Sequence, residues 1–211
     1  MTPRGANRPT LHVEGTDDLH SIIHLLRRHN VDESIIPSVK ETQGKESLLE
    51  LVETAVPLAE GRPVGFVLDA DSPRSSRWAQ VGERLQRVGL QPPPRVPKEG
   101  YVATSQEYQT KVGVWLMPDN DRDGTLEMFL RDLIQNGDQI IGHAEQATSE
   151  ARSMGADFSD PQRPKAVIHA WLAWQEEPGL PYGTAIKAHY FGKDSVAARR
   201  FVGWIKSLFG G

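Results

Sequence analysis

The chain has 211 residues, of which 38% are hydrophobic and 25% charged, a composition typical of an ordinary globular protein. It contains no cysteine, which excludes disulfide and thiolate chemistry. The formal net charge of −4 argues against a protein that coats duplex nucleic acid through a broad basic face, but it leaves room for a local basic cleft. The sequence has no apolar run near the roughly 20 residues that a membrane-spanning helix needs, and no signal-peptide core. We therefore expect a cytoplasmic protein that does not contact a membrane.

Residues 1–10 are polar and include proline, arginine and glycine, so we expect a flexible N-terminus. Residues 11–211 are predicted to form a single domain. Within it, the composition turns helical after Gly142, which predicts a helical C-terminal extension over approximately residues 138–211.

The first predicted strand covers residues 11–13 and runs into Glu14. Thr16 is a suitable N-cap for the helix that follows, and Asp17 and Asp18 favour the positive end of that helix. Glu14 is therefore expected at the carboxyl end of a strand. The alternative is that Glu14 is a solvated loop acid.

The stretch that organises the chain is an apolar run over residues 64–68, bounded by proline and glycine. Such a run is typical of a central parallel strand that is buried on both faces. It leads directly into Asp69, and Asp71 follows one residue later. Ligands of open α/β sheets bind at the carboxyl ends of the strands. The two aspartates are therefore candidate site residues.

Strands and helices alternate around this run. A short strand within residues 31–40 and a helix over residues 48–59 are predicted before it, and a helix over residues 78–88 after it. Residues 91–100 contain four prolines and are predicted to form an extended loop. A further strand, over residues 112–117, precedes an acidic loop and another helix. This order predicts an α/β fold with a mostly parallel sheet flanked by helices.

The C-terminal part is predicted to be helical. Helices are expected over residues 144–154 and 165–175, with a loop over residues 157–164 between them. A turn-rich link over residues 178–183 and a closing amphipathic helix over residues 197–208 complete the chain.

Glu14, Asp69 and Asp71 suggest a particular chemistry. Carboxylates that converge from separate strand ends cannot all stay ionised at low cost unless cations neutralise them. Oxygen ligands without cysteine favour Mg²⁺ or Mn²⁺ over zinc. Such ions polarise phosphoryl oxygens and activate bound water. The pattern therefore predicts metal-dependent phosphoryl chemistry.

The residues 13–18, Val-Glu-Gly-Thr-Asp-Asp, and 67–71, Val-Leu-Asp-Ala-Asp, resemble the motifs of the Toprim domain shared by topoisomerases, primases and related nucleases. The resemblance implies a Toprim-like sheet between helices and a divalent-metal site for making or breaking phosphodiester bonds. Glu14 matches the acid after the family's first strand, and Asp69 and Asp71 match its Asp-x-Asp motif. The resemblance covers roughly residues 11–135 in element order, and its specific motifs amount to about ten residues.

The residues 124–127, Gly-Thr-Leu-Glu, resemble the extra acidic motif of the Toprim nuclease domain in overcoming-lysogenization-defect nucleases. This resemblance implies Glu127 as a ligand of a second metal. It also implies a late catalytic lysine, for which Lys187 and Lys193 are the candidates, and an ATPase partner in bacterial defence. Pro73 replaces a third alternating acid, and no tyrosine-bearing domain is present, which argues against a topoisomerase.

The acidic loop over residues 119–127 has three interpretations. Its alternating aspartates match the opening of a calcium-binding loop, but Leu130 stands where that loop needs a bidentate glutamate. The loop also resembles the nucleophile motif of haloacid dehalogenase-like phosphatases, which implies Asp121 as nucleophile and Asp123 as general acid. The third interpretation is an acidic turn that caps the following helix.

From the sequence we thus expect a nuclease that uses Mg²⁺ or Mn²⁺, with Ca²⁺ less favoured, to hydrolyse the phosphodiester bonds of DNA or RNA. The alternatives are a non-catalytic Toprim module that binds a protein or nucleotide partner, and the phosphatase centred on Asp121. Several cations late in the chain form either a solvated helix face or a phosphate-contacting patch. These cations are Lys187, Lys193, Arg199, Arg200 and Lys206.

Overall fold

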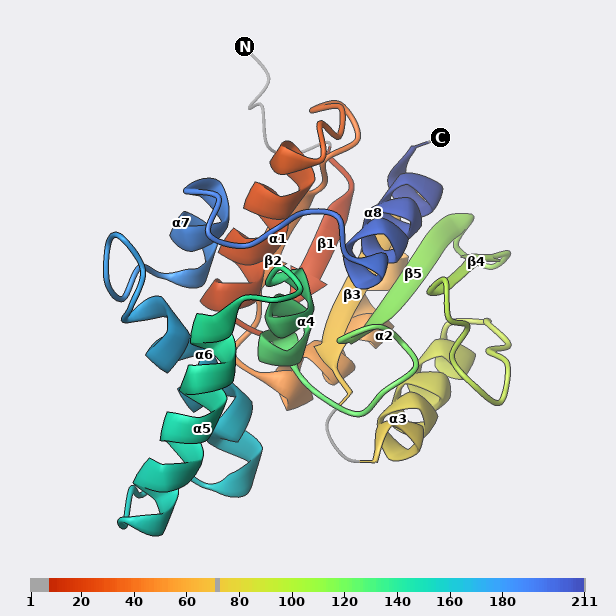
Figure 1. Cartoon of the computed structure of the whole chain (residues 1–211). Coiled ribbons are helices and arrows are strands. Elements are labelled where there is room, and N and C mark those ends of the chain that lie inside the picture. The colour runs from red at the N-terminus through yellow and green to blue at the C-terminus, as the bar shows by residue number, and fades with distance from the viewer. Residues whose placement is uncertain (1–7, 71–72, 211) are drawn as a thin grey trace.

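A five-stranded sheet lies between two layers of helices in the computed structural model, which describes residues 8–70 and 73–210 (Figure 1). The strands are β1 (Thr10–Val13), β2 (Ser38–Glu41), β3 (Val64–Asp69), β4 (Tyr101–Ser105) and β5 (Thr110–Met117). Their order across the sheet is β2-β1-β3-β5-β4. The β4–β5 pair is antiparallel and the other pairs are parallel.

The helices occupy the segments between and after the strands. They are α1 (Thr16–Arg28), α2 (Lys45–Leu58), α3 (Arg74–Arg87), α4 (Leu126–Leu133), α5 (Gln139–Ser153), the 3₁₀ turn η1 (Asp160–Gln162), α6 (Arg163–Leu172), α7 (Tyr182–Lys187) and α8 (Val196–Phe209). The predicted α/β fold, with a mostly parallel sheet flanked by helices and a helical C-terminal part, is therefore confirmed.

The central position of β3 follows from its apolar sequence. Its side chains alternate between the two faces of the sheet, as the pleat of a strand requires. Phe66 and Leu68 pack into the core under α2 and α3, and Val67 packs into the core on the opposite face. All three side chains are buried. The prediction of a strand covered on both faces is confirmed.

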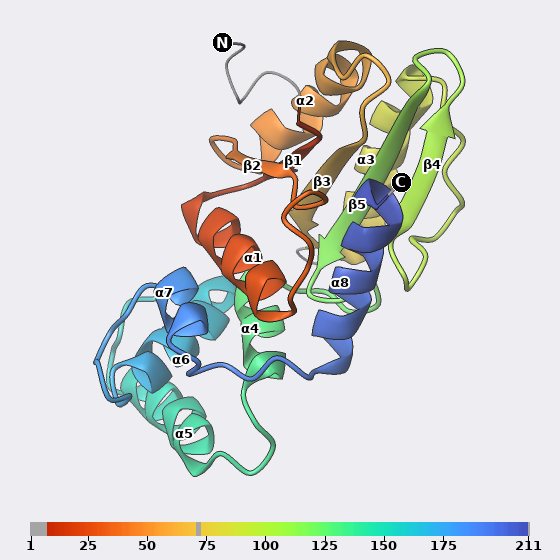
Figure 2. The same cartoon turned by 90° about the horizontal axis from the view of Figure 1, so that it is seen from above.

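Helix α8 covers the opposite face of the sheet, over β3 and β5 (Figure 2). Glycine on both strands allows this close approach: a Cβ added at Gly65 would lie 2.9 Å from the side chain of Leu208. Trp204 of α8 also packs on Trp115 of β5, with ring centroids 5.8 Å apart. The closing helix thus forms part of the main core.

Strand β4 was not predicted. Residues 101–105 follow the proline-rich loop and pair antiparallel with β5, through the short turn between Ser105 and Thr110. The predicted strand within residues 31–40 is displaced toward its C-terminal end and is observed as β2. Across the described residues, no helix is both long and apolar enough to cross a membrane.

The fold brings three parallel strand ends to one edge of the sheet. β1, β3 and β5 are neighbours with their carboxyl ends together, and α1 follows β1 while the acidic loop follows β5. This edge therefore holds most of the candidate residues from the sequence.

Candidate carboxylate site

Glu14 and Asp69 meet at the carboxyl edge of the sheet. β1 ends at Val13, which lies opposite Val67 in the register with β3, so Glu14 lies level with the end of the central strand. The Glu14 Oε1 atom accepts a hydrogen bond of 2.9 Å from the backbone N–H of Asp69. The two predicted acids are thus joined directly.

Asp69 is also joined to helix α4. Its Oδ1 atom accepts a hydrogen bond of 2.9 Å from the backbone N–H of Leu126, the first residue of that helix. A carboxylate at a helix N-terminus satisfies a free N–H group and interacts favourably with the helix dipole. This contact brings Asp69 to the helical turn that carries Glu127. The carboxylate of Glu127 accepts a hydrogen bond of 2.7 Å from the hydroxyl of Thr125.

Asp18, in the first turn of α1, completes the group. Its pKa is raised from 3.8 to about 7. Burial is the largest cause, and the negative charges of Glu14 and Glu127 add to it. Backbone N–H groups of Gly15 and Asp18 act in the opposite direction, as donors to the carboxylate. Sequence reasoning placed Asp18 at the positive end of a helix and within the Toprim-like motif of residues 13–18, but did not name it as a site residue. Its position one helical turn after Glu14 is the signal that could have identified it.

Burial and neighbouring negative charges also act on Asp69. Burial raises its pKa well above the usual value, followed by the charges of Asp18, Glu14 and Glu127. The hydrogen bond from Leu126 lowers it in part. We call Glu14, Asp18, Asp69 and Glu127 the carboxylate site. The charges of Glu14 and Glu127 raise the pKa of both Asp18 and Asp69, so a shared cation would stabilise these two aspartates in the charged form.

The donor chemistry of this site suits a hard divalent cation, because all four side chains offer carboxylate oxygens. However, within residues 8–70 and 73–210 no three acidic or histidine side chains are arranged closely enough to hold an ion together. Asp71, the remaining predicted ligand, lies outside the described residues. Metal binding therefore stays a prediction, and it requires side-chain rotation around Asp69 or a further ligand.

Residues of the C-terminal helices border the carboxylate site. Tyr182 of α7 is buried, and its pKa is raised by burial and then by the charges of Glu127 and Asp17. Lys165 of α6 pairs with Asp17, with 3.8 Å between the Nζ and Oδ2 atoms. Lys165 is therefore a cation close to the site that sequence reasoning missed, since no local motif marks it.

Lys187 and Lys193 lie elsewhere. Lys187 ends α7 and Lys193 lies in the loop before α8, and both line a hollow formed with the C-terminal half of α1. An α-helix rises about 1.5 Å per residue, so Arg28 in this hollow lies about 15 Å along α1 from Asp18. The structure thus brings the two candidate lysines together, but at the other end of α1 from the carboxylate site.

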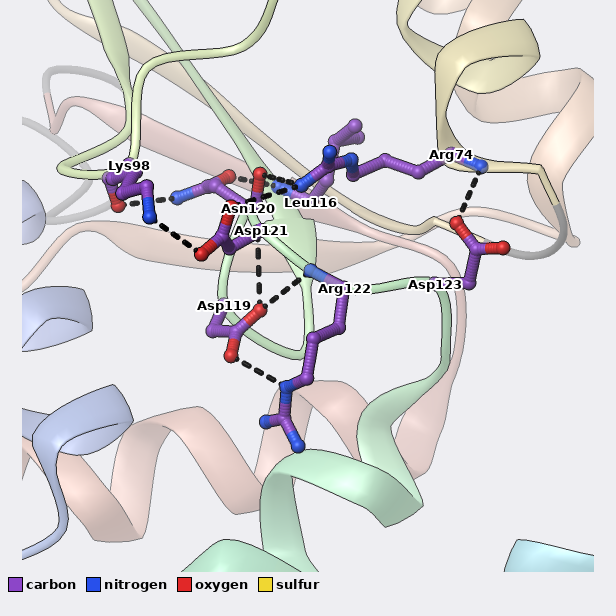
Figure 3. Close-up of polar contacts among 8 residues, drawn as sticks. All are labelled: Arg74, Lys98, Leu116, Asp119, Asn120, Asp121, Arg122 and Asp123. Atoms are coloured by element: carbon purple, nitrogen blue, oxygen red, sulfur yellow. Dashed lines mark hydrogen bonds and ion pairs between the residues drawn. The ribbon is translucent and has the colours of Figure 1, made fainter.

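The aspartates of the acidic loop have partners within the protein (Figure 3). The Asp119 carboxylate accepts hydrogen bonds from the N–H groups of Asp121 and Arg122, and pairs with the Arg122 guanidinium at 2.7 Å. Asp121 pairs with Lys98 at 2.7 Å, a contact that lowers the Asp121 pKa. These contacts are typical of a turn held by its own acids.

The remaining contacts fix the loop against the sheet. Asn120 is buried, accepts a hydrogen bond of 2.7 Å from the N–H of Leu116, and donates one to the carbonyl of Lys98 (Figure 3). Asp123 accepts a hydrogen bond of 2.8 Å from the N–H of Arg74. The aspartates of the loop point toward different partners. This arrangement favours an acidic turn over a calcium loop or a phosphatase nucleophile. The predicted cap of the following helix is not among these contacts, since Asp69 accepts the hydrogen bond from the first N–H of α4.

Comparison with known proteins gives one match. The model of the family described as "Protein of unknown function (DUF3226)" matches residues 8–210. No curated protein and no solved structure matches the chain. Because the match covers nearly the whole sequence, the chain belongs to the DUF3226 family.

Proposed function

We propose that this protein is a Toprim-type nuclease that hydrolyses phosphodiester bonds of DNA or RNA with Mg²⁺ or Mn²⁺. The observation that carries the proposal is the carboxylate site, in which Glu14, Asp18, Asp69 and Glu127 share one electrostatic environment. Divalent-metal phosphoryl transfer is a chemistry that gathers several acids in this way.

The order of the acids along the chain supports the same function. Glu14 follows the first strand and Asp69 ends the central strand, with Asp71 after it in sequence, in the pattern that resembles the Toprim motifs. The Asp69 carboxylate accepts a hydrogen bond from the first N–H of α4, which explains why the Gly-Thr-Leu-Glu motif lies beside these acids.

In the proposed site, Glu14, Asp69 and Asp71 would hold one ion, and Glu127 with Asp69 would hold a second, with Asp18 as an additional oxygen donor. When bound, such ions polarise a phosphoryl oxygen and lower the pKa of water. The chain's own groups orient these ligands. Glu14 fixes the backbone of Asp69, and the N-terminus of α4 holds the Asp69 carboxylate.

A basic group is also expected to offset the charge that develops on the phosphate. The sequence resemblance assigned this role to Lys187 or Lys193. Lys165 is a further candidate, because its contact with Asp17 places its ammonium group beside the first turn of α1. An ATPase partner stays part of the proposal only through the resemblance.

The test is incubation of the purified protein with labelled single-stranded and double-stranded DNA and RNA in Mg²⁺, Mn²⁺ or EDTA. We expect cleavage that needs the metal and is lost in Asp69→Asn and Glu14→Gln. Glu83→Gln is the matched control, since this exposed acid of α3 lies away from the site. Mn²⁺ binding, measured by calorimetry, should weaken in the same two variants.

The outcomes separate the alternatives. A protein that neither cleaves any of these substrates nor binds Mn²⁺ contradicts the nuclease, and binding of a nucleotide or protein partner would then favour a non-catalytic module. Release of phosphate from small esters that depends on Asp121 and not on Glu14 would favour the phosphatase.

A further inference from the structure

A hollow of about 580 Å³ lies beside the C-terminal half of α1 and is lined by basic side chains. Helix α1 and the turn after it contribute some of the lining residues, and α7 and the loop before α8 contribute the others. The ionisable lining residues are His24, Arg27, Arg28, Lys187, His189 and Lys193. We call this feature the basic hollow. The remaining lining residue is Asn30, so none of the acids in the described part of the chain lines the hollow.

Positive charge accumulates here although the whole chain carries a net charge of −4. The pKa of His24 is lowered by burial and then by the charges of Arg27 and Lys187. Acids lie close to this hollow. Glu33 pairs with Arg27 at 3.2 Å through two exposed side chains, Asp194 acts on Arg28, and both Asp132 and Asp194 line a neighbouring hollow with Arg28 and Lys193. These acids offset part of the positive charge, but the lining of the basic hollow itself carries four permanent cations, Arg27, Arg28, Lys187 and Lys193.

The wall of the hollow is held in position by the core. The Arg28 guanidinium donates a hydrogen bond of 2.5 Å to the backbone carbonyl of Phe191. Phe191 is fully buried and packs on Trp171, with ring centroids 4.9 Å apart. Arg28 is therefore fixed in place before any ligand arrives, which lowers the entropic cost of binding an anion.

The cations that were grouped with Lys187 and Lys193 in the sequence separate from them in the fold. Arg199 donates a hydrogen bond to the carbonyl of Asp194, and Arg200 pairs with Glu99 at 3.4 Å. Neither lines the basic hollow. Instead, the basic hollow combines cations of α1 with cations of the α7–α8 segment, which are far apart in sequence.

We propose that the basic hollow binds the sugar–phosphate backbone of a nucleic-acid strand at a distance from the point of cleavage. This inference rests on the proposed nuclease function and specifies how its substrate is held. The hollow extends along α1 from about 9 Å to about 15 Å from Asp18, counted at 1.5 Å per residue. One strand carries a phosphate about every 3.4 Å along the axis of duplex DNA, and phosphates are farther apart in an extended strand, so the contacts fall a few phosphates from the carboxylate site.

The size and composition of the hollow suit a chain of phosphates better than a single one. Its volume exceeds that of one phosphate group, and its cations come from three separate segments. Contacts to the backbone position a strand without reading its sequence. We therefore expect binding that is tolerant of sequence and strongly dependent on salt.

The experiment measures binding without cleavage. Anisotropy of a labelled 20-nucleotide DNA or RNA strand is followed in EDTA over a range of salt concentrations. The variant combines Arg27→Gln, Lys187→Gln and Lys193→Gln, and its control combines Arg87→Gln, Arg152→Gln and Lys206→Gln. The control removes the same charge from surfaces outside the basic hollow.

We expect the hollow variant to bind at least tenfold more weakly at low salt, with the slope of log K against log salt reduced by about two to three. The control should stay within about threefold, and thermal melting should show that both triple variants are folded. Equal affinities of the two variants would overturn the proposal. Binding of inorganic polyphosphate without binding of DNA or RNA would also overturn it.

The same assay separates this inference from the nuclease proposal. Glu83→Gln, at an exposed acid of α3 outside both sites, should bind the strand as the unmodified protein does, because it leaves the basic hollow intact. If the protein binds the strand through the hollow but cleaves nothing in Mn²⁺, the nuclease proposal fails and the binding site stands. If the protein cleaves the strand in Mn²⁺, and the hollow variant keeps both its affinity for the strand and its rate of cleavage, the proposal for the basic hollow fails and the nuclease proposal stands.

Discussion

The carboxylate site and the acidic loop are both rich in acids, but the acids of the loop are paired with cations and those of the site lie next to other acids. In the loop, Asp119 and Asp121 are each paired with a cation, and the pKa of Asp121 is lowered by Lys98. In the carboxylate site, Asp18 and Asp69 are partly buried among other acids, and both pKa values are raised. The comparison shows that a structural turn differs from a candidate site in whether its acids are paired with cations, and not in how many acids it has.

The largest expected effect is on activity. Asp69→Asn should lower metal-dependent cleavage at least 100-fold, because the Asp69 carboxylate is central to the proposed metal site. Asp121→Asn should leave cleavage within about threefold, because Asp121 is exposed and paired with Lys98. Initial rates in Mn²⁺ measure both. A greater loss in Asp121→Asn than in Asp69→Asn would reverse the assignment of the two regions.

The next effect is the dependence of stability on pH. The folded-state pKa of Asp18, about 7, lies above the usual 3.8, so the folded protein binds the proton more tightly than the unfolded chain. This group's contribution to stability is fully present below about pH 4 and is lost as the pH rises through 7. In EDTA, Asp18→Asn should therefore be more stable than the unmodified protein at pH 8, by on the order of 2 kcal/mol, and equal to it near pH 4.

Urea unfolding at pH 4, 6 and 8 measures this difference. Asp119→Asn serves as the matched control, because Asp119 is paired with Arg122 and its replacement should give no gain at pH 8. A gain from Asp18→Asn that is the same at every pH would show that charge is not its cause.

A smaller effect, on stability, is expected when the hydrogen bonds that Asp119 makes within the acidic loop are removed. Asp119→Ala removes the acceptor of two backbone N–H groups and the partner of Arg122. We expect a loss of about 1–2 kcal/mol in the free energy of unfolding, since such turn contacts resemble helix caps. Mn²⁺ affinity, measured by calorimetry, should not change. A large fall in Mn²⁺ affinity would instead indicate a metal site in the loop.

The smallest effect is expected for Lys98→Gln. The ion pair with Asp121 joins two exposed side chains, 61% and 43% accessible, and such pairs contribute about 0–1 kcal/mol. Urea unfolding at low and high salt measures the change, which should become smaller as the salt screens the pair. A loss above 2 kcal/mol would mean that this contact holds the loop against the sheet.

Some site residues could be predicted from the sequence because their signal is local. The apolar run of β3 indicates a buried strand, and strand ends carry their next residues to the edge of the sheet. Glu14 and Asp69 could therefore be placed together. Asp18 could not be placed so easily, since an acid in the first turn of a helix has an ordinary structural explanation. The edge strand β4 was missed for a similar reason, because its five residues lack a strong apolar pattern.

By itself, the sequence determined the α/β class, the central strand and the edge on which Glu14 and Asp69 lie, because hydrophobic periodicity and strand direction are properties of consecutive residues. Only the tertiary structure decided which charges are compensated and which are not. It paired Asp121 of the loop with two distant cations, Lys98 and Arg74. The tertiary structure also places Lys187 beside the C-terminal end of α1, far from the carboxylate site, and places the N-terminus of α4 against Asp69. Such partners depend on how helices pack across the sheet, a relation between residues far apart that no local pattern records.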